Sequence, residues 1–183
     1  AGHFDAETTQ SAASRVLAAH RHAVIPGFYG VRPDGEIKTF SRGGSDISGA
    51  IVARAAGADI YENWTDVSGF LMADPRIIDN PKPIDVITYR ELRELSYMGA
   101  TVLHEDSIFP VRKASIPIHI RNTNKPEDPG TLIVPRLRDL KKAGDITGIA
   151  GHKGFTVLSV EKAMMNSELG FGRRVLTVIE QNG

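Results

Sequence analysis

The sequence contains no cysteine, no excess of charge of either sign and no long apolar run. Without cysteine there are no disulfides, thiolate metal sites or cysteine nucleophiles, and such a composition suits the cytosol. The 22 basic and 22 acidic residues cancel, so the net charge does not favour nucleic acid or an anionic membrane surface. No apolar run approaches the ~20 residues of a membrane span, and the start lacks a signal-peptide pattern. We therefore expect a cytoplasmic protein with no nucleic-acid partner and no membrane partner.

The 183 residues are 41% hydrophobic and 24% charged, which suits a soluble globular protein of one domain or slightly more. The histidines have no metal-ligand spacing with carboxylates, so no metal site is predicted.

The stretch from Ser41 to Ala50 contains two adjacent glycines between a predicted strand and a predicted helix. Glycines there let backbone N–H groups approach an anion at the positive end of the helix dipole, and Arg42 adds a planar cation. The spacing is neither a Walker loop nor Gly-x-Gly-x-x-Gly. An equally weighted interpretation is a plain strand-to-helix turn in which Ser45 or Asp46 caps the helix.

Apolar periodicity and turn residues divide the chain into short elements. Pro33-Asp34-Gly35 indicates a hairpin, and Thr88 with Glu91 has the form of a helix capping box. The pattern predicts helices over 5–20, 47–56, 88–98, 104–114 and 168–182. It predicts strands over 23–26, 37–40, 59–64, 84–87, 116–120, 131–134, 146–150 and 155–160, with 116–120 half-exposed or at a sheet edge.

Three domain-level segments follow from composition. Residues 1–134 form the first, and the basic stretch 135–145 is a predicted linker. Residues 146–183 form a further segment with one strand region and one helix, too little to bury their own apolar faces. We expect from this that the second domain is cut short.

Several motifs resemble, in order and spacing, those of the aspartate kinases (aspartokinases), members of the amino-acid kinase family. They are Phe28-Tyr29-Gly30, the 41–46 loop, Trp64-Thr65-Asp66-Val67-x-Gly69, Asp74-Pro75-Arg76 and Met98-Gly99-Ala100-x-Val102-Leu103-His104. The likeness continues into 155–173, which resembles the start of an ACT domain. The resemblance implies an α/β fold: the C-terminal, ATP-binding lobe of the kinase domain, with a mostly parallel central sheet flanked by helices, then a partial ACT segment.

The resemblance also implies an activity, the ATP-dependent phosphorylation of the side-chain carboxylate of L-aspartate to 4-phospho-L-aspartate in amino-acid biosynthesis. Mg²⁺ would be held mainly through the ATP phosphates. By position, Asp46 orients the reacting groups, and aspartate is bound by Arg42, Gly43, Gly44 and Ser45. ATP is bound by Thr65, Asp66, Leu71, Arg76, Thr101 and Val102. A lysine or threonine effector would meet Met165, Ser167, Gly170 and Phe171, and the parent enzyme would be a homo-oligomer.

The family's N-terminal Lys-x-Gly-Gly loop is missing, so we expect a truncated piece of an aspartokinase that is inactive alone. Two departures, Thr101 where lysine is common and Leu71 where tyrosine is common, affect the nucleotide site. Two alternatives remain: a related amino-acid kinase with another substrate, and a non-catalytic nucleotide-binding, regulatory or interaction piece.

Overall fold

The structure is a computed structural model that describes residues 4–40, 43–97, 103, 105–137, 146–151, 153–154 and 156–182. The chain divides into two compact units, with the boundary between residues 152 and 153. No helix in these ranges is long and apolar enough to cross a membrane.

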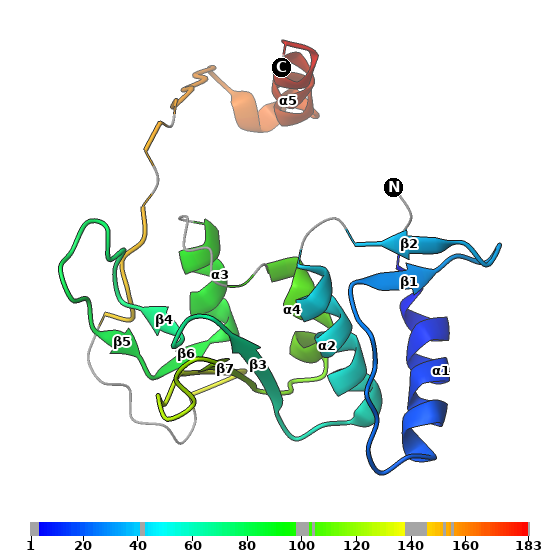
Figure 1. Ribbon diagram of the computed structural model, residues 1–183. Coiled ribbons are helices and arrows are strands. Elements are labelled where there is room, and N and C mark those ends of the chain that lie inside the picture. The colour runs from blue at the N-terminus through cyan, green and yellow to red at the C-terminus, as the bar shows by residue number, and fades with distance from the viewer. Residues whose placement is uncertain are drawn as a thin grey trace. The chain divides into compact units, whose positions relative to one another are not determined.

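The first unit alternates short strands with helices (Figure 1). In chain order its elements are α1 (Ala6–Ala18), β1 (Tyr29–Val31), β2 (Ile37–Thr39), α2 (Gly44–Ala56), β3 (Tyr61–Thr65), β4 (Phe70–Leu71), β5 (Pro83–Ile84), β6 (Val86–Thr88), α3 (Tyr89–Tyr97), α4 (Glu105–Lys113), β7 (Ile118–Asn122) and β8 (Thr131–Val134). The second unit contains a 3₁₀ turn, η1 (Met165–Ser167), and α5 (Phe171–Asn182).

The central sheet has the strand order β3-β7-β8-β6. β3 with β7 and β8 with β6 are parallel pairs, whereas β7 and β8 are antiparallel, so the sheet is mostly parallel as expected. The prediction that 116–120 is an edge strand is wrong, because β7 lies between β3 and β8. The alternative of a half-exposed strand agrees with the alternation of buried and partly buried residues along β7. Pro117 precedes the strand and therefore removes no hydrogen bond from its ladder.

The core lies between this sheet and helices α2, α3 and α4, which stand side by side in Figure 1. Ile118 and Ile120 of β7, Ile133 of β8 and Ile87 of β6 have no exposed surface. Burying an isoleucine side chain stabilises the fold by about 1.5–3 kcal/mol. α1 packs outside α2, where Ser14 Oγ donates to the carbonyl of Ala55 over 2.8 Å.

Local signals set most element boundaries. Asp5 caps α1 by accepting from the Thr8 amide, and the Pro33-Asp34-Gly35 turn joins antiparallel β1 and β2. The capping box at α3 is confirmed: Thr88 N and Oγ1 donate to Glu91 Oε2, and the Glu91 amide donates to Thr88 Oγ1.

Three predicted strands are wrong. Residues 23–26 form no strand, and Val24 is fully exposed. Residues 146–150 and the described residues 156–160 also form no strand, because their backbone does not join a sheet ladder. Instead, the Ile149 amide donates to the Met72 carbonyl in the first unit. The division into kinase segment, linker and ACT segment at 134 and 145 stays a prediction.

Candidate active site

The glycine-rich loop leads directly into α2. Gly43 is the residue before the helix, with φ 61° and ψ 23°, and no side chain caps the helix start. The interpretation in which Ser45 or Asp46 is the N-cap is therefore wrong, because both lie inside the first turn. The first amides of α2 have no partner within the helix, so this end can receive an anion.

Gly44 lies under two phenylalanines. A Cβ at Gly44 would lie 2.6 Å from Cδ2 of Phe28 and 2.9 Å from Cβ of Phe40. Phe28 itself has φ 73°, and its amide donates to Ser48 Oγ over 2.9 Å. Ser48 Oγ in turn donates to the Gly44 carbonyl over 2.7 Å. The Phe28-Tyr29-Gly30 motif is thus bound to the start of α2, and Gly44 permits the close approach.

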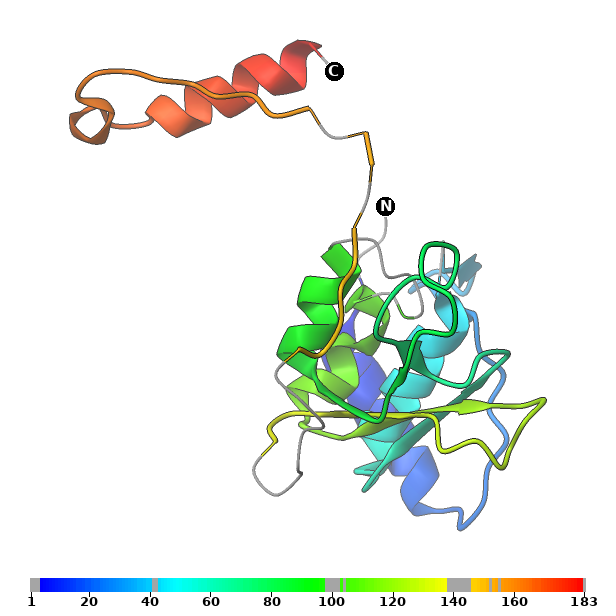
Figure 2. The same cartoon turned by 90° about the vertical axis from the view of Figure 1, so that its left-hand side faces the viewer.

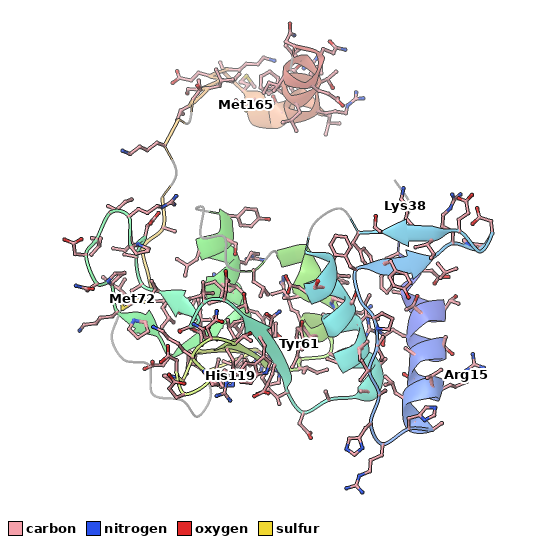
Figure 3. The ribbon with its side chains drawn as sticks, viewed as in Figure 1. Arg15, Lys38, Tyr61, Met72, His119 and Met165 are labelled. Atoms are coloured by element: carbon pink, nitrogen blue, oxygen red, sulfur yellow. The ribbon has the colours of Figure 1, made fainter. Side chains whose placement is uncertain are left out.

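Asp46 is held by a side chain of β3. Asn63 Nδ2 donates to Asp46 Oδ1 over 2.8 Å and approaches the Tyr61 hydroxyl at 3.2 Å, and only 7% of Asn63 is exposed. The Tyr61 hydroxyl lies 3.5 Å from the Asp46 carbonyl oxygen. Tyr61 is labelled in Figure 3. One oxygen of the Asp46 carboxylate is therefore fixed in direction by the sheet.

Tyr61 stays neutral in this cluster. Burial raises the pKa of Tyr61 to about 12, the hydrogen bond from Asn63 opposes the shift, and the negative charge of Asp46 adds to it. Sequence reasoning missed Tyr61 and Asn63. Two features of β3 could have indicated them. The two-residue period of a strand places Tyr61, Asn63 and Thr65 on one face, and the polar Asn63 lies at a buried position, where it requires a partner.

Thr65 and Asp66 lie where β3 ends. The Thr65 hydroxyl donates to Asp66 Oδ1 over 3.2 Å, and the Thr65 carbonyl accepts from the Thr123 amide at the end of neighbouring β7. Because β3 and β7 are parallel, their carboxyl ends meet at one edge of the sheet, which is where ligands bind in open α/β sheets. The Asp66 side chain is exposed there.

Buried and partly buried polar side chains hold the loop after Asp66. Asn122 Nδ2 donates to Ser68 Oγ over 2.8 Å, and Ser68 Oγ donates to Asp128 Oδ2 over 2.5 Å. Thr131, which is fully buried, accepts from the Phe70 amide at 2.8 Å and donates to the Ile84 carbonyl at 2.6 Å. These bonds fix the base of the segment Phe70 to Arg76. We call it the nucleotide segment because it contains the predicted ATP-binding residues Leu71 and Arg76.

Two predicted ATP residues lie on the nucleotide segment. Leu71 is 42% exposed on β4. Arg76 is paired with Asp74: its Nε donates to both carboxylate oxygens at 3.0 and 3.1 Å, and its Nη2 donates to Oδ2 at 2.6 Å. To meet phosphates through the same Nε–Nη2 edge, Arg76 would exchange this carboxylate for them.

Three comparisons place these residues in a family. The family model for the amino acid kinase family matches residues 3–122. The chain belongs to the amino acid kinase family. Aspartokinase 3 of Bacillus subtilis (strain 168) is 46% identical over 160 residues, which is 87% of this chain and 35% of that protein.

Solved aspartokinases have similar structures. An aspartate kinase of Clostridium acetobutylicum has a TM-score of 0.86 and 58% identity, covering 98% of this chain and 41% of its own. Two structures of E. coli aspartokinase III, one with lysine and aspartate and one with aspartate and ADP, have TM-scores of 0.55 and 0.56. Both are 35% identical and cover 62% of this chain and 25% of theirs. The chain thus spans less than half the length of these relatives.

The family match fits the α2 to β3 junction described above. Within the described ranges, the structure brings Gly43, Gly44, Ser45 and Asp46 together at the start of α2, with Ser45 exposed, and places Thr65 two residues beyond the Asp46 partner Asn63. Leu71 and Arg76 follow on the nucleotide segment. Arg42, Thr101 and Val102 lie outside the described residues.

The predicted effector residues of this family member lie in the second unit. Met165 and Ser167 belong to η1, where the Ser167 hydroxyl donates to the Met164 carbonyl. Ser167 is therefore not the N-cap of α5, because Gly170 with φ 76° separates the two helices. Phe171 begins α5, and Lys162 Nζ lies 5.1 Å from the centroid of its ring. A role in effector binding stays a prediction.

The Asp74–Arg76 pair gives a pH prediction. The side-chain hydrogen bonds from Arg76, then the bond from its backbone amide, lower the pKa of Asp74 from 3.8 to about 2. A lowered carboxyl pKa stabilises the fold above the unfolded value of 3.8, and this contribution is lost as pH falls through about 2. Carboxyl NMR should show Asp74 titrating near pH 2, and at a higher pH in Arg76→Gln, where only the backbone bond from residue 76 remains. Arg32→Gln is the control, and an unshifted Asp74 in the unaltered chain would contradict the pairing.

Proposed function

We propose that the protein containing this chain phosphorylates the side-chain carboxylate of L-aspartate with ATP, giving 4-phospho-L-aspartate for lysine, threonine and methionine biosynthesis. The observation that carries the proposal is the Asp46–Asn63 contact, which joins the glycine-rich start of α2 to the strand that ends at Thr65. In a chain similar to aspartokinases, these are the two halves that a carboxylate and a nucleotide require. Since the chain spans only part of its relatives, the activity belongs to the whole protein.

The aspartate side of the reaction uses the start of α2. The amides of Gly43, Gly44 and Ser45, with Arg42, bind carboxylate oxygens of aspartate. The nucleophile is a carboxylate oxygen, ionised at neutral pH, which forms a bond to the γ-phosphorus while the bond from that phosphorus to the β,γ-bridging oxygen breaks and ADP leaves. No proton has to be removed, so Asp46 acts by orienting the reacting groups and not as a base.

The nucleotide side uses the edge after β3. Thr65 and Asp66 contact the base and ribose, Leu71 packs against the nucleotide, and Arg76 leaves Asp74 to meet the phosphates. Thr101 and Val102 close the site. This arrangement is supported by the exposure of Asp66, Leu71 and Arg76 at or after the carboxyl end of a parallel strand.

Mg²⁺ fits this site through ATP. No group of three or more carboxylate or histidine side chains able to hold a metal ion occurs within the described ranges. Mg²⁺ keeps several waters and commonly binds through substrate phosphates with one or two carboxylates. Asp46 and Asp66 are the carboxylates among the residues proposed to bind or orient the substrates. When bound, Mg²⁺ supplies neutralisation of phosphate charge.

Regulation and assembly are further parts of the proposal. We propose a lysine or threonine effector for the whole protein, and the structure of E. coli aspartokinase III with lysine supports the first of these. Its contacts would include Met165, Ser167, Gly170 and Phe171, in a partial ACT domain over 146–183. We also propose that the whole protein is a homo-oligomer in the cytoplasm.

Calorimetric titration of ATP into this chain tests the proposal. Binding is expected, and Asp66→Ala should weaken it about tenfold because a hydrogen bond to a charged group is lost. Asp79→Ala, which removes another exposed carboxylate, is the matched control. ATP binding without transfer to aspartate by this chain alone is the expected result. A folded, monodisperse sample that binds no ATP would favour an interaction or regulatory role, and transfer to another acceptor would favour a different amino-acid kinase.

A further inference from the structure

Three residues after the predicted linker, which belong to the first unit, contact earlier parts of that unit at two places. We call Thr147, Gly148 and Ile149 the strap. Thr147 Oγ1 donates to Glu91 Oε1 over 2.7 Å, and the Ile149 amide donates to the Met72 carbonyl, also over 2.7 Å. In Figure 2 the orange trace that begins with the strap passes in front of α3. Irregular backbone is thus held by both a side-chain bond and a main-chain bond.

Glu91 is a rigid anchor for the strap. Its other carboxylate oxygen, Oε2, accepts from both the amide and the hydroxyl of Thr88 in the α3 capping box. A carboxylate fixed by these two bonds cannot follow a moving partner, so Thr147 is held relative to α3.

Met72 is the point where the strap reaches the nucleotide segment. The Met72 amide donates to the Lys82 carbonyl over 2.8 Å, and Met72 follows Leu71 and precedes the Asp74–Arg76 pair. Both polar groups of the Met72 backbone are therefore bonded, one within the β4–β5 ladder region and one to the strap. Figure 3 labels Met72 at this position.

Gly148 fits closely between these anchors. A Cβ at Gly148 would lie 3.2 Å from the Met72 carbonyl oxygen, 3.4 Å from Leu95 Cδ1 and 3.5 Å from Ile84 Cδ1. At Gly151, three residues later, a Cβ would meet nothing within 4 Å. A side chain at Gly148 would therefore meet backbone of the nucleotide segment and apolar side chains of α3 and β5.

We propose that the strap positions the nucleotide segment for ATP. Its two bonds connect α3 to Met72, so releasing the strap frees the carbonyl between the residue that packs against the nucleotide and the arginine that meets the phosphates. The inference rests on the proposed function for its effect on ATP. The second unit begins four residues after Ile149, so the strap is also the part of the nucleotide site closest to it along the chain.

Paired variants of this chain test the strap. Gly148→Val should release it, whereas Gly151→Val should not. Thr147→Val removes the bond to Glu91, and Thr147→Ser restores it. We expect Gly148→Val and Thr147→Val to raise the ATP dissociation constant about fivefold, the effect of losing one hydrogen bond that orders a site, with Gly151→Val and Thr147→Ser near the unaltered value.

Amide hydrogen exchange provides a second readout that needs no nucleotide. The Ile149 amide should be protected in the unaltered chain, and Gly148→Val should speed exchange at Ile149, Met72 and Ile77. Fast exchange at Ile149 in the unaltered chain, or unchanged ATP affinity once Ile149 is released, would overturn the inference. If the unaltered chain binds no ATP but Met72 and Ile77 still loosen in Gly148→Val, the strap positions the segment as inferred and the proposed function alone has failed.

Discussion

Asp46→Asn is expected to lower kcat by about two to three orders of magnitude, the loss seen when a preorganised polar group is removed from a transition state, with ATP affinity nearly unchanged. Asparagine keeps the shape of the side chain and an oxygen that can accept from Asn63, so the cluster with Tyr61 stays assembled. What is lost is the negative charge beside the start of α2. The measurement is steady-state kinetics with aspartate and ATP on the longest natural chain that contains these residues.

The structural alternative for Asp46 predicts a different result. A carboxylate in the first turn of a helix stabilises it by about 0.3–1 kcal/mol through the helix dipole. If Asp46 did only this, Asp46→Asn would slightly lower the unfolding free energy and leave kcat unchanged. Asp59→Asn removes an exposed charge just before β3 and serves as the control for net charge. A stable Asp46→Asn protein with full kcat would rule out the proposed role.

Gly130→Ala is expected to destabilise the first unit by about 3–5 kcal/mol, from backbone strain and overpacking together. Gly130 has φ 70°, and an added Cβ would lie 2.0 Å from the Ile120 carbonyl oxygen, in the backbone of the central strand β7. Relieving that contact must move Thr131, whose hydroxyl holds Phe70 and Ile84 at the base of the nucleotide segment. Loss of stability and loss of ATP affinity should therefore occur together.

Gly35→Ala separates the two causes. Gly35 also has a positive φ, 86°, but a Cβ there would meet nothing within 4 Å. Its cost should be about 1–2 kcal/mol, the conformational penalty alone. Urea unfolding of both variants gives the two free energies, and equal losses would show that the contact with Ile120 is relieved without cost.

Local sequence signals predicted most helices and strands of the first unit, although they added a strand at 23–26 and omitted β4. The Pro33-Asp34-Gly35 hairpin and the Thr88 capping box act within a few residues, so they are visible without knowledge of the fold. Strand neighbours depend on residues far apart in the chain. For that reason the sequence could not show that β7 is central, or that Ile149, within the predicted strand 146–150, bonds to Met72 instead of joining a sheet.

The candidate site was predicted in the same uneven way. Asp46 and Thr65 lie in short motifs whose residues and spacing can be read from the sequence. Asn63 and Tyr61 lie in an ordinary strand, and their importance comes from which face of β3 meets α2. A buried asparagine requires a partner, so the period of the strand together with this requirement was the available clue.

Trp64 makes the end of β3 observable by light. It is the only tryptophan in the sequence, so all indole emission comes from one known place. Trp64 is 45% exposed and lies on the face of β3 opposite to Thr65, and the Arg121 guanidinium lies 4.7 Å from the centroid of its ring. Arg121 Nη2 also donates to the Pro126 carbonyl in the loop after β7. A change in emission on adding ATP would therefore report a change at this edge of the sheet, without any added label.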